Sequence, residues 1–273
     1  MKTRILTALI LLPPVIYLIG WSPWWLFLGA VMLTVVLALH EYFRICRASG
    51  FQPLPALGYA GAVGTCLAQT WGVLGAPNPT AALLGLFILL TMALALLRNA
   101  DLKQYLAGVA ATVLGVAYIA LPLSFFLLLR YRDAEAGPRW VLLLCLVIWS
   151  GDICAYLVGR TVGRHRLFAR VSPKKTYEGA VAGLGGGLLV AWAFKYWWWK
   201  TADLGTVLLL AGLVAVAGQI GDFVESAIKR GAGLKDSGSI LPGHGGMLDR
   251  IDALLFGAAT LWLALTVKDL GLL

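Results

Sequence analysis

Charged residues are scarce in this chain of 273 residues: only 13% are Asp, Glu, Lys or Arg, and 60% are hydrophobic. Soluble globular domains carry about 25% charged residues and roughly 45–50% apolar ones. A single water-exposed domain cannot bury this much apolar surface. The scarcity of charge therefore excludes an ordinary soluble domain and predicts an all-α integral membrane protein.

Cysteine is also scarce, and no pair has the C-x-x-C spacing of zinc and redox sites. The four cysteines, Cys46, Cys66, Cys145 and Cys154, all lie in or beside apolar runs. We expect them to act as small hydrophobic residues without disulfides or zinc. The G-x-x-x-x-G-K-[ST] phosphate-binding loop is absent too. The net charge of +9 forms no basic stripe on a soluble face, so we expect no nucleic-acid partner.

Long apolar runs dominate the chain and predict a polytopic bundle of about nine transmembrane helices. The basic start of the chain resembles a signal peptide, but we expect a retained first helix, interrupted at Pro13 and Pro14. The predicted spans are Ile5–Ile19, Trp24–Leu39, Leu54–Val73, Ala81–Leu97, Leu106–Leu129, Trp140–Val158, Gly179–Tyr196, Val207–Ile228 and Ile251–Val267.

The positive charges are distributed unevenly between the two ends of these spans. An N-terminus inside places 16 of the 22 Lys and Arg residues on the inner side. The positive-inside rule then predicts an internal N-terminus and an external C-terminus. Without an organellar transit peptide, the expected location is a bacterial inner membrane. We expect residues 1–140 to serve as scaffold, for dimerisation or for lipid access, and residues 141–273 to form the catalytic region, with cytoplasmic-face loops 159–178 and 229–250.

Polar side chains gather at the end of the eighth predicted span. Asp222, Ser226 and Lys229 are spaced i, i+4 and i+7, so they share one face of a helix, and Glu225 flanks that face. A carboxylate, a hydroxyl and an ammonium group together suit a phosphate bound to a metal ion. The alternative is a helix end whose charges are merely solvated.

A glycine-rich loop follows, and glycines allow backbone N–H groups to approach an anion closely. Lys235 adds positive charge to this loop. His244 is a candidate for phosphate contact or proton transfer, and a structural hydrogen bond in a turn is the equal alternative. The pattern predicts an anion-binding loop, although a glycine-rich loop alone is not specific to anion binding.

Two carboxylates open the ninth predicted span. Asp249 and Asp252 are spaced i, i+3, near a helix start where carboxylates also stabilise the helix dipole. With Asp222 from the preceding helix, they form a candidate site for one or two divalent cations, because Mg²⁺ takes few protein oxygens and several from phosphate. Arg250 between them also fits simple positive-inside placement.

A second polar block begins with Asp152, an ionisable residue inside an apolar span that needs a partner or a water-filled cavity. The loop after this span carries Lys174, Lys175 and Thr176, followed by Glu178. Thr176 is a candidate helix cap. Headgroup binding by a positive-inside loop is the alternative, but it gives no reason for the threonine and the glutamate. Together the two blocks predict phosphoryl or nucleotidyl transfer at a membrane surface.

The motifs in about Trp149–Asp252 resemble those of the phosphatidate cytidylyltransferases, also called CDP-diacylglycerol synthases. Asp152–Arg160 and Ser172–Gly179 resemble two upstream motifs of that family. The signature elements present are Ser226, Ile228, Lys229-Arg230, Lys235-Asp236, Gly238, Leu241-Pro242, His244-Gly245-Gly246 and Asp249-Arg250-Ile251-Asp252.

The resemblance implies transfer of the cytidylyl group of CTP to phosphatidic acid, giving CDP-diacylglycerol and pyrophosphate in phospholipid biosynthesis, with Mg²⁺. Asp222, Asp249 and Asp252 would hold the metal; a second metal or K⁺ stays open. It also implies a homodimer in the bilayer. The implied phosphate-binding or catalytic residues are Ser226, Lys174, Lys175, Thr176, Lys229, Arg230, Lys235, His244 and Arg250. The supporting polar residues are Asp152, Glu178, Glu225 and Asp236.

Two other functions are alternatives. A CTP-dependent polyprenol or lipid kinase would transfer the γ-phosphoryl group instead and release CDP. A secondary transporter for an anion would need polar residues near the midplane and repeat symmetry between its halves. The charges here gather at one predicted membrane face and in the C-terminal half, which disfavours the transporter.

Overall fold

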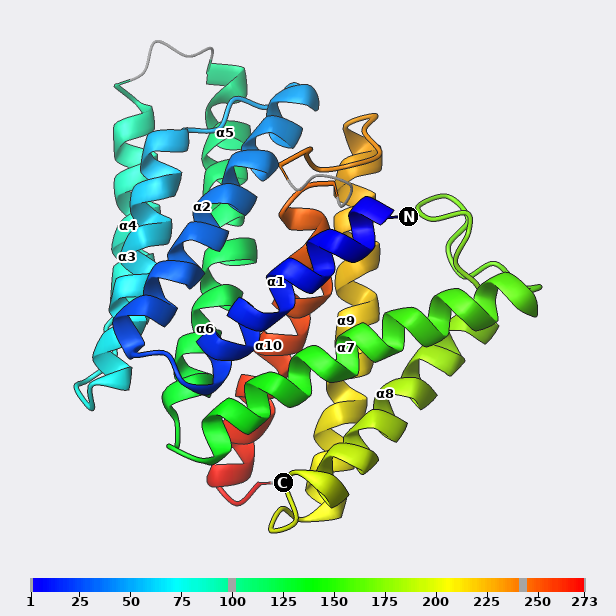
Figure 1. Cartoon of the computed structure of the whole chain (residues 1–273). Helices are drawn as coiled ribbons and strands as arrows, with labels where there is room; N and C mark the ends of the chain where they lie inside the picture. Colours follow the sequence, from blue (N-terminus) through cyan, green and yellow to red (C-terminus); the bar gives the residue numbers. More distant parts are fainter. Residues whose placement is uncertain (1, 98–101, 241–244, 273) are drawn as a thin grey trace. The chain divides into compact units, whose positions relative to one another are not determined.

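The computed structural model describes residues 2–97, 102–240 and 245–272, with the side chains of residues 2–9 and 11 outside that description. Within these ranges every named element is helical, and one isolated β-bridge joins Arg166 to Thr176. Figure 1 shows the helices in chain order. The predicted all-α fold is confirmed.

Each of the nine predicted spans coincides with a helical segment of the described chain. The fifth span is one continuous helix that contains a short π-helix, η1. The helices are α1 (Lys2–Gly20), α2 (Trp24–Ala48), α3 (Pro55–Val73), α4 (Thr80–Ala95), α5 (Leu102–Gly115), η1 (Val116–Ala120), α6 (Leu121–Tyr131), α7 (Ala136–Thr161), α8 (Tyr177–Trp197), α9 (Leu204–Gly231) and α10 (Leu248–Asp269).

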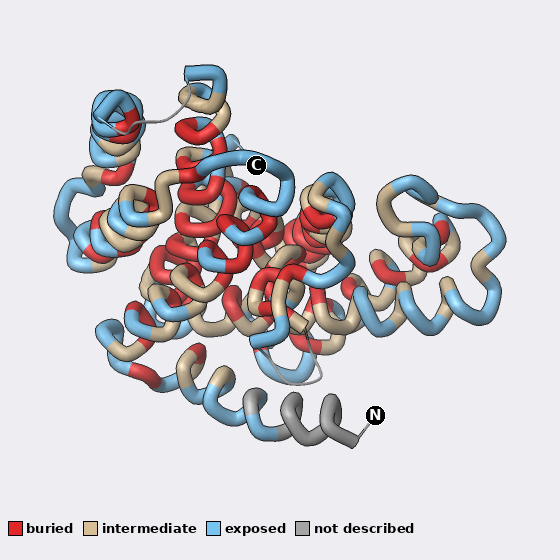
Figure 2. The backbone as a smooth tube through the Cα atoms, turned by 90° about the horizontal axis from the view of Figure 1, so that it is seen from above, coloured by how far each residue is buried: buried red, intermediate tan, exposed pale blue. Residues whose placement is uncertain are grey.

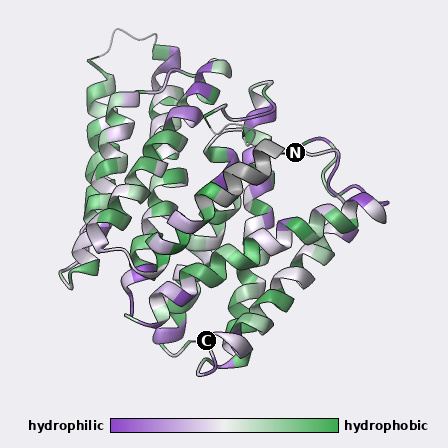
Figure 3. Cartoon of the chain, viewed as in Figure 1, coloured by the Kyte–Doolittle hydropathy of each residue, from purple (hydrophilic) through white to green (hydrophobic). Residues whose placement is uncertain are grey.

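Six of these helical segments, within the described residues, are long and apolar enough to cross a membrane: α2, α5–α6 with η1, α7, α8, α9 and α10. The apolar helix α4 has only 16 residues, which is short for a core of about 30 Å. Hydrophobic residues run along the helices and hydrophilic residues concentrate at their ends and in the loops (Figure 3). The chain is thus a polytopic membrane protein, and the larger number of spans stays a prediction.

The chain divides into two compact units. The first unit comprises residues 1–133 and 228–251, and the second comprises residues 134–227 and 252–273. Helices α9 and α10 each contribute residues to both units. The functional division at residue 140 stays a prediction, but the packing units do not follow it, because residues 228–251 pack with the N-terminal helices.

In the first unit, α3 packs against α2, α4, α5, η1 and α6. Apolar side chains fill the interior, among them Leu39, Phe43, Ile119 and Leu127, each at most 1% exposed. Figure 2 shows the buried positions following the inner sides of the helices while the outer sides stay exposed. In a membrane, those outer sides are available to lipid.

In the second unit, α7 and α8 lie side by side (Figure 1). Their backbones approach closely at glycines: a Cβ added to Gly151 would lie 3.2 Å from the Gly183 carbonyl oxygen. A Cβ on Gly218 of α9 would lie 3.6 Å from the Cβ of Ala253 in α10. The glycines of the seventh span therefore permit close helix packing, as small residues do in membrane proteins.

Three local features differ from the sequence predictions or go beyond them. The interruption at Pro13 and Pro14 is wrong, because α1 continues through both prolines; apolar surroundings favour keeping the remaining backbone hydrogen bonds within the helix. Helix α2 continues to Ala48, beyond the predicted end at Leu39. The π-helix precedes Pro122, whose missing N–H disrupts the regular α-helical bonding.

Candidate active site

In the second unit, the loop between α7 and α8 brings a lysine to a carboxylate of α9. The Lys175 ammonium forms an ion pair with Asp222, and both side chains are about one-third exposed, at 32% and 30%. The isolated bridge that includes Arg166 and the hydrogen bond from Leu167 N–H to the Lys175 carbonyl (3.1 Å) shape this loop. The structure therefore joins one residue from each predicted polar block.

Aromatic side chains support the same ion pair. The Lys175 Nζ lies 4.4 Å from the centroid of the Phe223 ring, within the range of a cation–π interaction. Phe168 of the loop contacts Phe223 edge-on, with ring centroids 5.0 Å apart. These ring contacts orient the Lys175 side chain toward Asp222. The sequence analysis did not single out Phe168 or Phe223.

The N-terminus of α8 fixes the end of the loop. The Thr176 hydroxyl accepts a hydrogen bond from Gly179 N–H (3.1 Å), so the predicted cap is confirmed. The Glu178 carboxylate accepts from His165 N–H (3.3 Å) and lies 2.6 Å from His165 Nδ1. Thr176 is only 4% exposed. The observed contacts of Thr176 and Glu178 are structural, and phosphate binding by Thr176 stays a prediction.

Two further carboxylates, Asp252 and Asp152, belong to the second unit. Asp252 interacts with both Asp222 and Asp152, and also with Lys175. Asp152 lines a small pocket with Gln219 and small residues of α7, α8 and α9. Gln219 in turn donates a hydrogen bond to the Ala180 carbonyl (3.0 Å). Apart from Asp152 and Gln219 the lining of this pocket is apolar, and the Asp152 side chain is exposed.

Helix α9 is continuous from Leu204 to Gly231, so the i, i+4, i+7 spacing places Asp222, Ser226 and Lys229 on one helix face. The Ser226 hydroxyl donates to Asp222 Oδ1 over 3.4 Å, a long hydrogen bond. Glu225 is buried, with 1% exposure. The hydroxyl next to the carboxylate matches the predicted arrangement, whereas the role of Glu225 stays a prediction.

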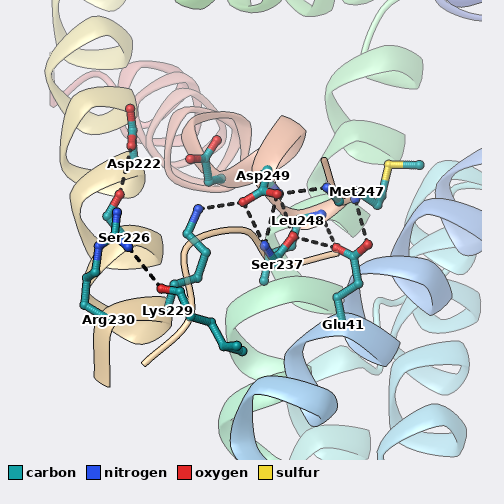
Figure 4. A network of polar contacts seen from close by, with 12 residues as sticks. Glu41, Asp222, Ser226, Lys229, Arg230, Ser237, Met247, Leu248 and Asp249 are labelled. Carbon is teal, nitrogen blue, oxygen red and sulfur yellow. Dashed lines mark hydrogen bonds and ion pairs between the residues drawn. The ribbon is translucent and has the colours of Figure 1, made fainter. Parts of the chain in front are cut away.

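In the first unit, Asp249 is surrounded by donors (Figure 4). Lys229 Nζ donates to Oδ1 over 2.6 Å, and Gly246 N–H donates to Oδ2 over 2.8 Å. Ser237 N–H lies 3.2 and 3.1 Å from the two oxygens. The Asp249 and Lys229 side chains are 9% and 11% exposed. Asp249 therefore joins the end of α9 to the described residues Ser237 and Gly246 that precede α10.

A residue that the sequence analysis missed also binds this loop. Glu41 of α2 is 2% exposed and accepts hydrogen bonds from the Met247 and Leu248 N–H groups and from the Ser237 hydroxyl (Figure 4). Arg44, one turn later, donates to the Ser237 carbonyl. The available signal was a carboxylate followed by further apolar residues, Tyr42 and Phe43, which indicates that the apolar helix continues past it.

The other predicted site residues are placed as follows. Arg230 is exposed and donates to the Leu234 carbonyl over 3.2 Å. His244 and the pair Leu241-Pro242 lie outside the described residues. The side chains of Lys174, Lys235, Asp236 and Arg250 are exposed. The structure thus leaves several basic groups accessible for phosphate, and their binding roles stay predictions.

The carboxylates of the second unit suit a hard cation. Within the described ranges, no three His, Cys, Asp or Glu side chains converge as a complete ligand set. Mg²⁺ does not need one, because it commonly takes one or two carboxylates together with water and substrate phosphates. Asp222 and Asp252 supply such oxygens, and their mutual repulsion favours a cation between or near them. The donor chemistry therefore fits Mg²⁺.

The described contacts define what the site residues can do chemically. Carboxylates with an adjacent lysine can bind a metal-complexed polyphosphate, since the metal and the lysine both neutralise phosphate charge. The second cluster, around Asp249, fixes the backbone at Ser237 and Gly246 through hydrogen bonds.

Comparison with known proteins identifies the group to which this chain is related. The model of the cytidylyltransferase family matches residues 2–268. The chain is 34% identical over 266 residues to a phosphatidate cytidylyltransferase of Synechocystis sp., covering 86% of each protein. It is 40% identical over 147 residues to the enzyme of that name from Staphylococcus aureus, covering 54% of this chain and 55% of that protein. For the Bacillus subtilis enzyme of that name the identity is 41% over 143 residues, covering 52% and 53%.

The family model covers nearly the whole chain, including the N-terminal helices, which lie outside the motifs in about Trp149–Asp252. The longest of these alignments likewise extends well beyond the signature loop, residues 232–247 between α9 and α10. The motif-bearing loops and the remaining helices therefore match the same family. This chain belongs to the cytidylyltransferase family.

Proposed function

We propose that this protein is a CTP:phosphatidate cytidylyltransferase, which converts CTP and phosphatidic acid into CDP-diacylglycerol and pyrophosphate. The observation that carries the proposal is the Lys175–Asp222 ion pair, both members of which interact electrostatically with Asp252. This arrangement is suited to a metal-bound triphosphate, and it lies in a protein whose relatives are named for this reaction.

In the proposed reaction, an oxygen of the phosphatidate phosphate attacks the α-phosphorus of CTP. The new P–O bond forms as the bond between the α-phosphorus and the bridging oxygen of the β-phosphate breaks, and the electron pair leaves with pyrophosphate. The attacking oxygen is already an anion, so no strong general base is required. Most of the acceleration then comes from holding two anions together in line.

Basic side chains and one serine hydroxyl hold the two anions in position. We assign triphosphate binding to Lys174 and Lys175 of the α7–α8 loop. Ser226 donates a hydrogen bond to phosphate from the face of α9 that carries Asp222. The accessible side chains of Arg230 and Lys235 bind phosphate oxygens of CTP or the lipid.

Asp222 and Asp252 are the residues we assign to Mg²⁺, with a second metal or K⁺ left open. The ion would supply charge neutralisation on the phosphates as pyrophosphate leaves. Asp249 already accepts hydrogen bonds from one ammonium and two amide groups. We therefore assign Asp249 the role of holding the signature loop. To act as a metal ligand, as predicted, Asp249 would have to exchange one of these hydrogen bonds for a bond to the metal.

The membrane setting follows from the apolar helices and the distribution of basic residues. We propose the bacterial inner membrane, an internal N-terminus, an external C-terminus and an active site on the cytoplasmic face, where CTP is available. Phosphatidic acid would reach the site from the bilayer. Assembly as a homodimer is part of the same proposal and rests on the family resemblance.

The direct test uses purified protein in detergent with CTP, phosphatidic acid and Mg²⁺. We expect pyrophosphate release that depends on the lipid, in equal amount to a lipid product heavier by one cytidylyl group in mass spectrometry. EDTA should stop the reaction. Formation of CDP with a phosphorylated lipid would instead show a CTP-dependent kinase and contradict the proposal.

A further inference from the structure

Glu41 is a charged residue in the apolar part of the first unit, near the end of α2. Its side chain is 2% exposed, and a buried carboxylate is costly unless its oxygens are hydrogen-bonded. Three donors meet it, and all come from residues 237–248. Met247 N–H donates to Oε1 (3.0 Å), while Leu248 N–H and the Ser237 hydroxyl donate to Oε2 (2.9 and 2.8 Å).

Two of these donors belong to the start of α10. The first N–H groups of a helix have no partner within the helix, and α10 begins at Leu248. The Glu41 carboxylate accepts from Met247 and Leu248 and lies at the positive end of the helix dipole. Glu41 therefore caps α10 from a distant helix and fixes the point at which the signature loop becomes helical.

The third donor links Glu41 to the charged pair of the loop. The Ser237 hydroxyl donates to Glu41 and accepts from Asp249 N–H (3.3 Å), and the Ser237 N–H donates to the Asp249 carboxylate. Asp249 binds Lys229. A connected set of hydrogen bonds thus runs from Glu41 through Ser237 and Asp249 to Lys229 (Figure 4).

Two glycines of the signature are explained by the position of this carboxylate. The three heavy atoms nearest to a Cβ added at Gly238 all belong to Glu41, and Cδ would lie 2.6 Å away. A Cβ at Gly246 would lie 2.6 Å from the Gly238 nitrogen and closer still to Ser237 Oγ and Glu41 Oε2. Three hydrogen bonds fix the carboxylate, so it cannot move aside without releasing the loop.

We propose that Glu41 is a positioning residue of the cytidylyl-transfer site, acting through Ser237 and Asp249 on the described parts of the connection between α9 and α10, residues 232–240 and 245–247. This inference rests on the proposed function for its catalytic consequence. The hold of Glu41 on the loop can be measured without catalysis. The proposal gives α2 a role in the site, whereas the sequence analysis expected residues 1–140 to serve as scaffold, for dimerisation or for lipid access.

The first experiment replaces Glu41 by Gln, which keeps the shape but leaves one acceptor oxygen and adds an N–H₂ group. We expect kcat/KM per folded molecule to fall about ten- to hundredfold, the effect of losing one hydrogen bond to a charged group. Under native conditions, trypsin should cleave after the exposed Lys235 faster in the variant than in the wild type. Wild-type kcat/KM together with wild-type cleavage would overturn the proposal.

The second experiment is a double-mutant cycle of Glu41→Ala and Gly238→Ala. In the presence of Glu41, Gly238→Ala should lower kcat/KM and speed cleavage at Lys235. In the Glu41→Ala background it should add little, because the atoms that the new Cβ would meet are gone. Additive effects of the two substitutions would overturn the proposal.

Controls keep both experiments decisive. Gly231→Ala, at a position where an added Cβ meets nothing within 4 Å, should leave activity and cleavage unchanged. If Glu41→Ala does not fold, Glu41→Asp retracts the carboxylate by one methylene, and we expect it to make Gly238→Ala less harmful; unchanged harm would overturn the proposal. Absence of cytidylyl transfer by the wild type would defeat the proposed function, while coupling in the proteolysis cycle would still support the hold of Glu41 on the loop.

Discussion

Asp222 is the residue whose loss should affect catalysis and folding stability most differently. Its carboxylate pairs with Lys175 and accepts a long hydrogen bond from Ser226. The ion pair is about one-third exposed, and such pairs contribute at most about 1 kcal/mol to stability. Catalysis depends on the same carboxylate much more strongly, because it would hold the cation that neutralises the phosphates.

We therefore expect Asp222→Asn to lower kcat at least about a hundredfold, while the unfolding temperature changes little. Cytidylyl transfer and thermal unfolding of the purified variant check this. Asp203→Asn is the matched control: Asp203 accepts from Thr206 N–H (2.7 Å) before α9, and Asn caps a helix about as well as Asp. Near-normal turnover by Asp222→Asn would contradict the metal assignment.

At this scale the sequence predicted the chemistry better than the contacts. The spacing of Asp222, Ser226 and Lys229 followed from helical periodicity, and α9 confirms their shared face. Glu41 could not be paired with the signature loop, because 196 residues separate it from Ser237. Local patterns carry no information about which distant helix supplies a partner, so the hydrogen bonds that hold Asp249 were beyond prediction.

Among the elements, α8 has a defined start that a conservative substitution can test. Thr176 accepts from Gly179 N–H at the first turn. Removing such a cap costs about 1 kcal/mol, so we expect Thr176→Ala to lower the unfolding temperature by about 2–4 °C. Thr176→Ser retains the hydroxyl and should behave like the wild type. Equal destabilisation by both variants would contradict a capping role.

The contact between α7 and α8 provides a second test with an adjacent control. A Cβ at Gly186 would lie 2.8 Å from the Cys154 Cβ and closer to its sulfur, whereas one at Gly185 meets nothing within 4 Å. Overpacking costs about 1–3 kcal/mol, so Gly186→Ala should unfold at a lower temperature and Gly185→Ala should not. Thermal unfolding in detergent measures both. Equal behaviour would show that these backbones need not approach closely.

Helix positions were largely predictable because apolar runs long enough to cross a bilayer are a strong signal. Helix ends were less so. The second predicted span ends at Leu39, but α2 continues to Ala48 because the interior of the first unit accepts Tyr42 and Phe43 as well as Glu41. The π-helix at Val116–Ala120 depends on local hydrogen bonding that hydropathy does not register.

For the whole molecule, the orientation in the membrane is the most accessible property. Helix α7 has 26 residues and is thus about 39 Å long, enough to place its two ends on opposite faces of a bilayer. Ala134 precedes α7, and Ala169 lies in the loop after it. With Cys154 replaced by Ala, a membrane-impermeant maleimide on intact cells should label A134C but not A169C. The reverse pattern would contradict the cytoplasmic active site.

Free cysteines make that experiment practical. Cys46, Cys66 and Cys145 are buried, and all four cysteines, which lie in the described residues, have free thiols. The native background of labelling should therefore be low once Cys154 is removed. Strong labelling of the cysteine-reduced parent would show that the helices pack less tightly than the structure describes.

The central claim is that the whole protein moves the cytidylyl group of CTP to a lipid phosphate. The most direct measurement supplies the purified protein with phosphatidic acid, Mg²⁺ and CTP labelled either at the α or at the γ phosphate. We predict α label in the lipid and γ label in released pyrophosphate. Appearance of γ label in the lipid, or retention of both labels in unreacted CTP, would contradict the account.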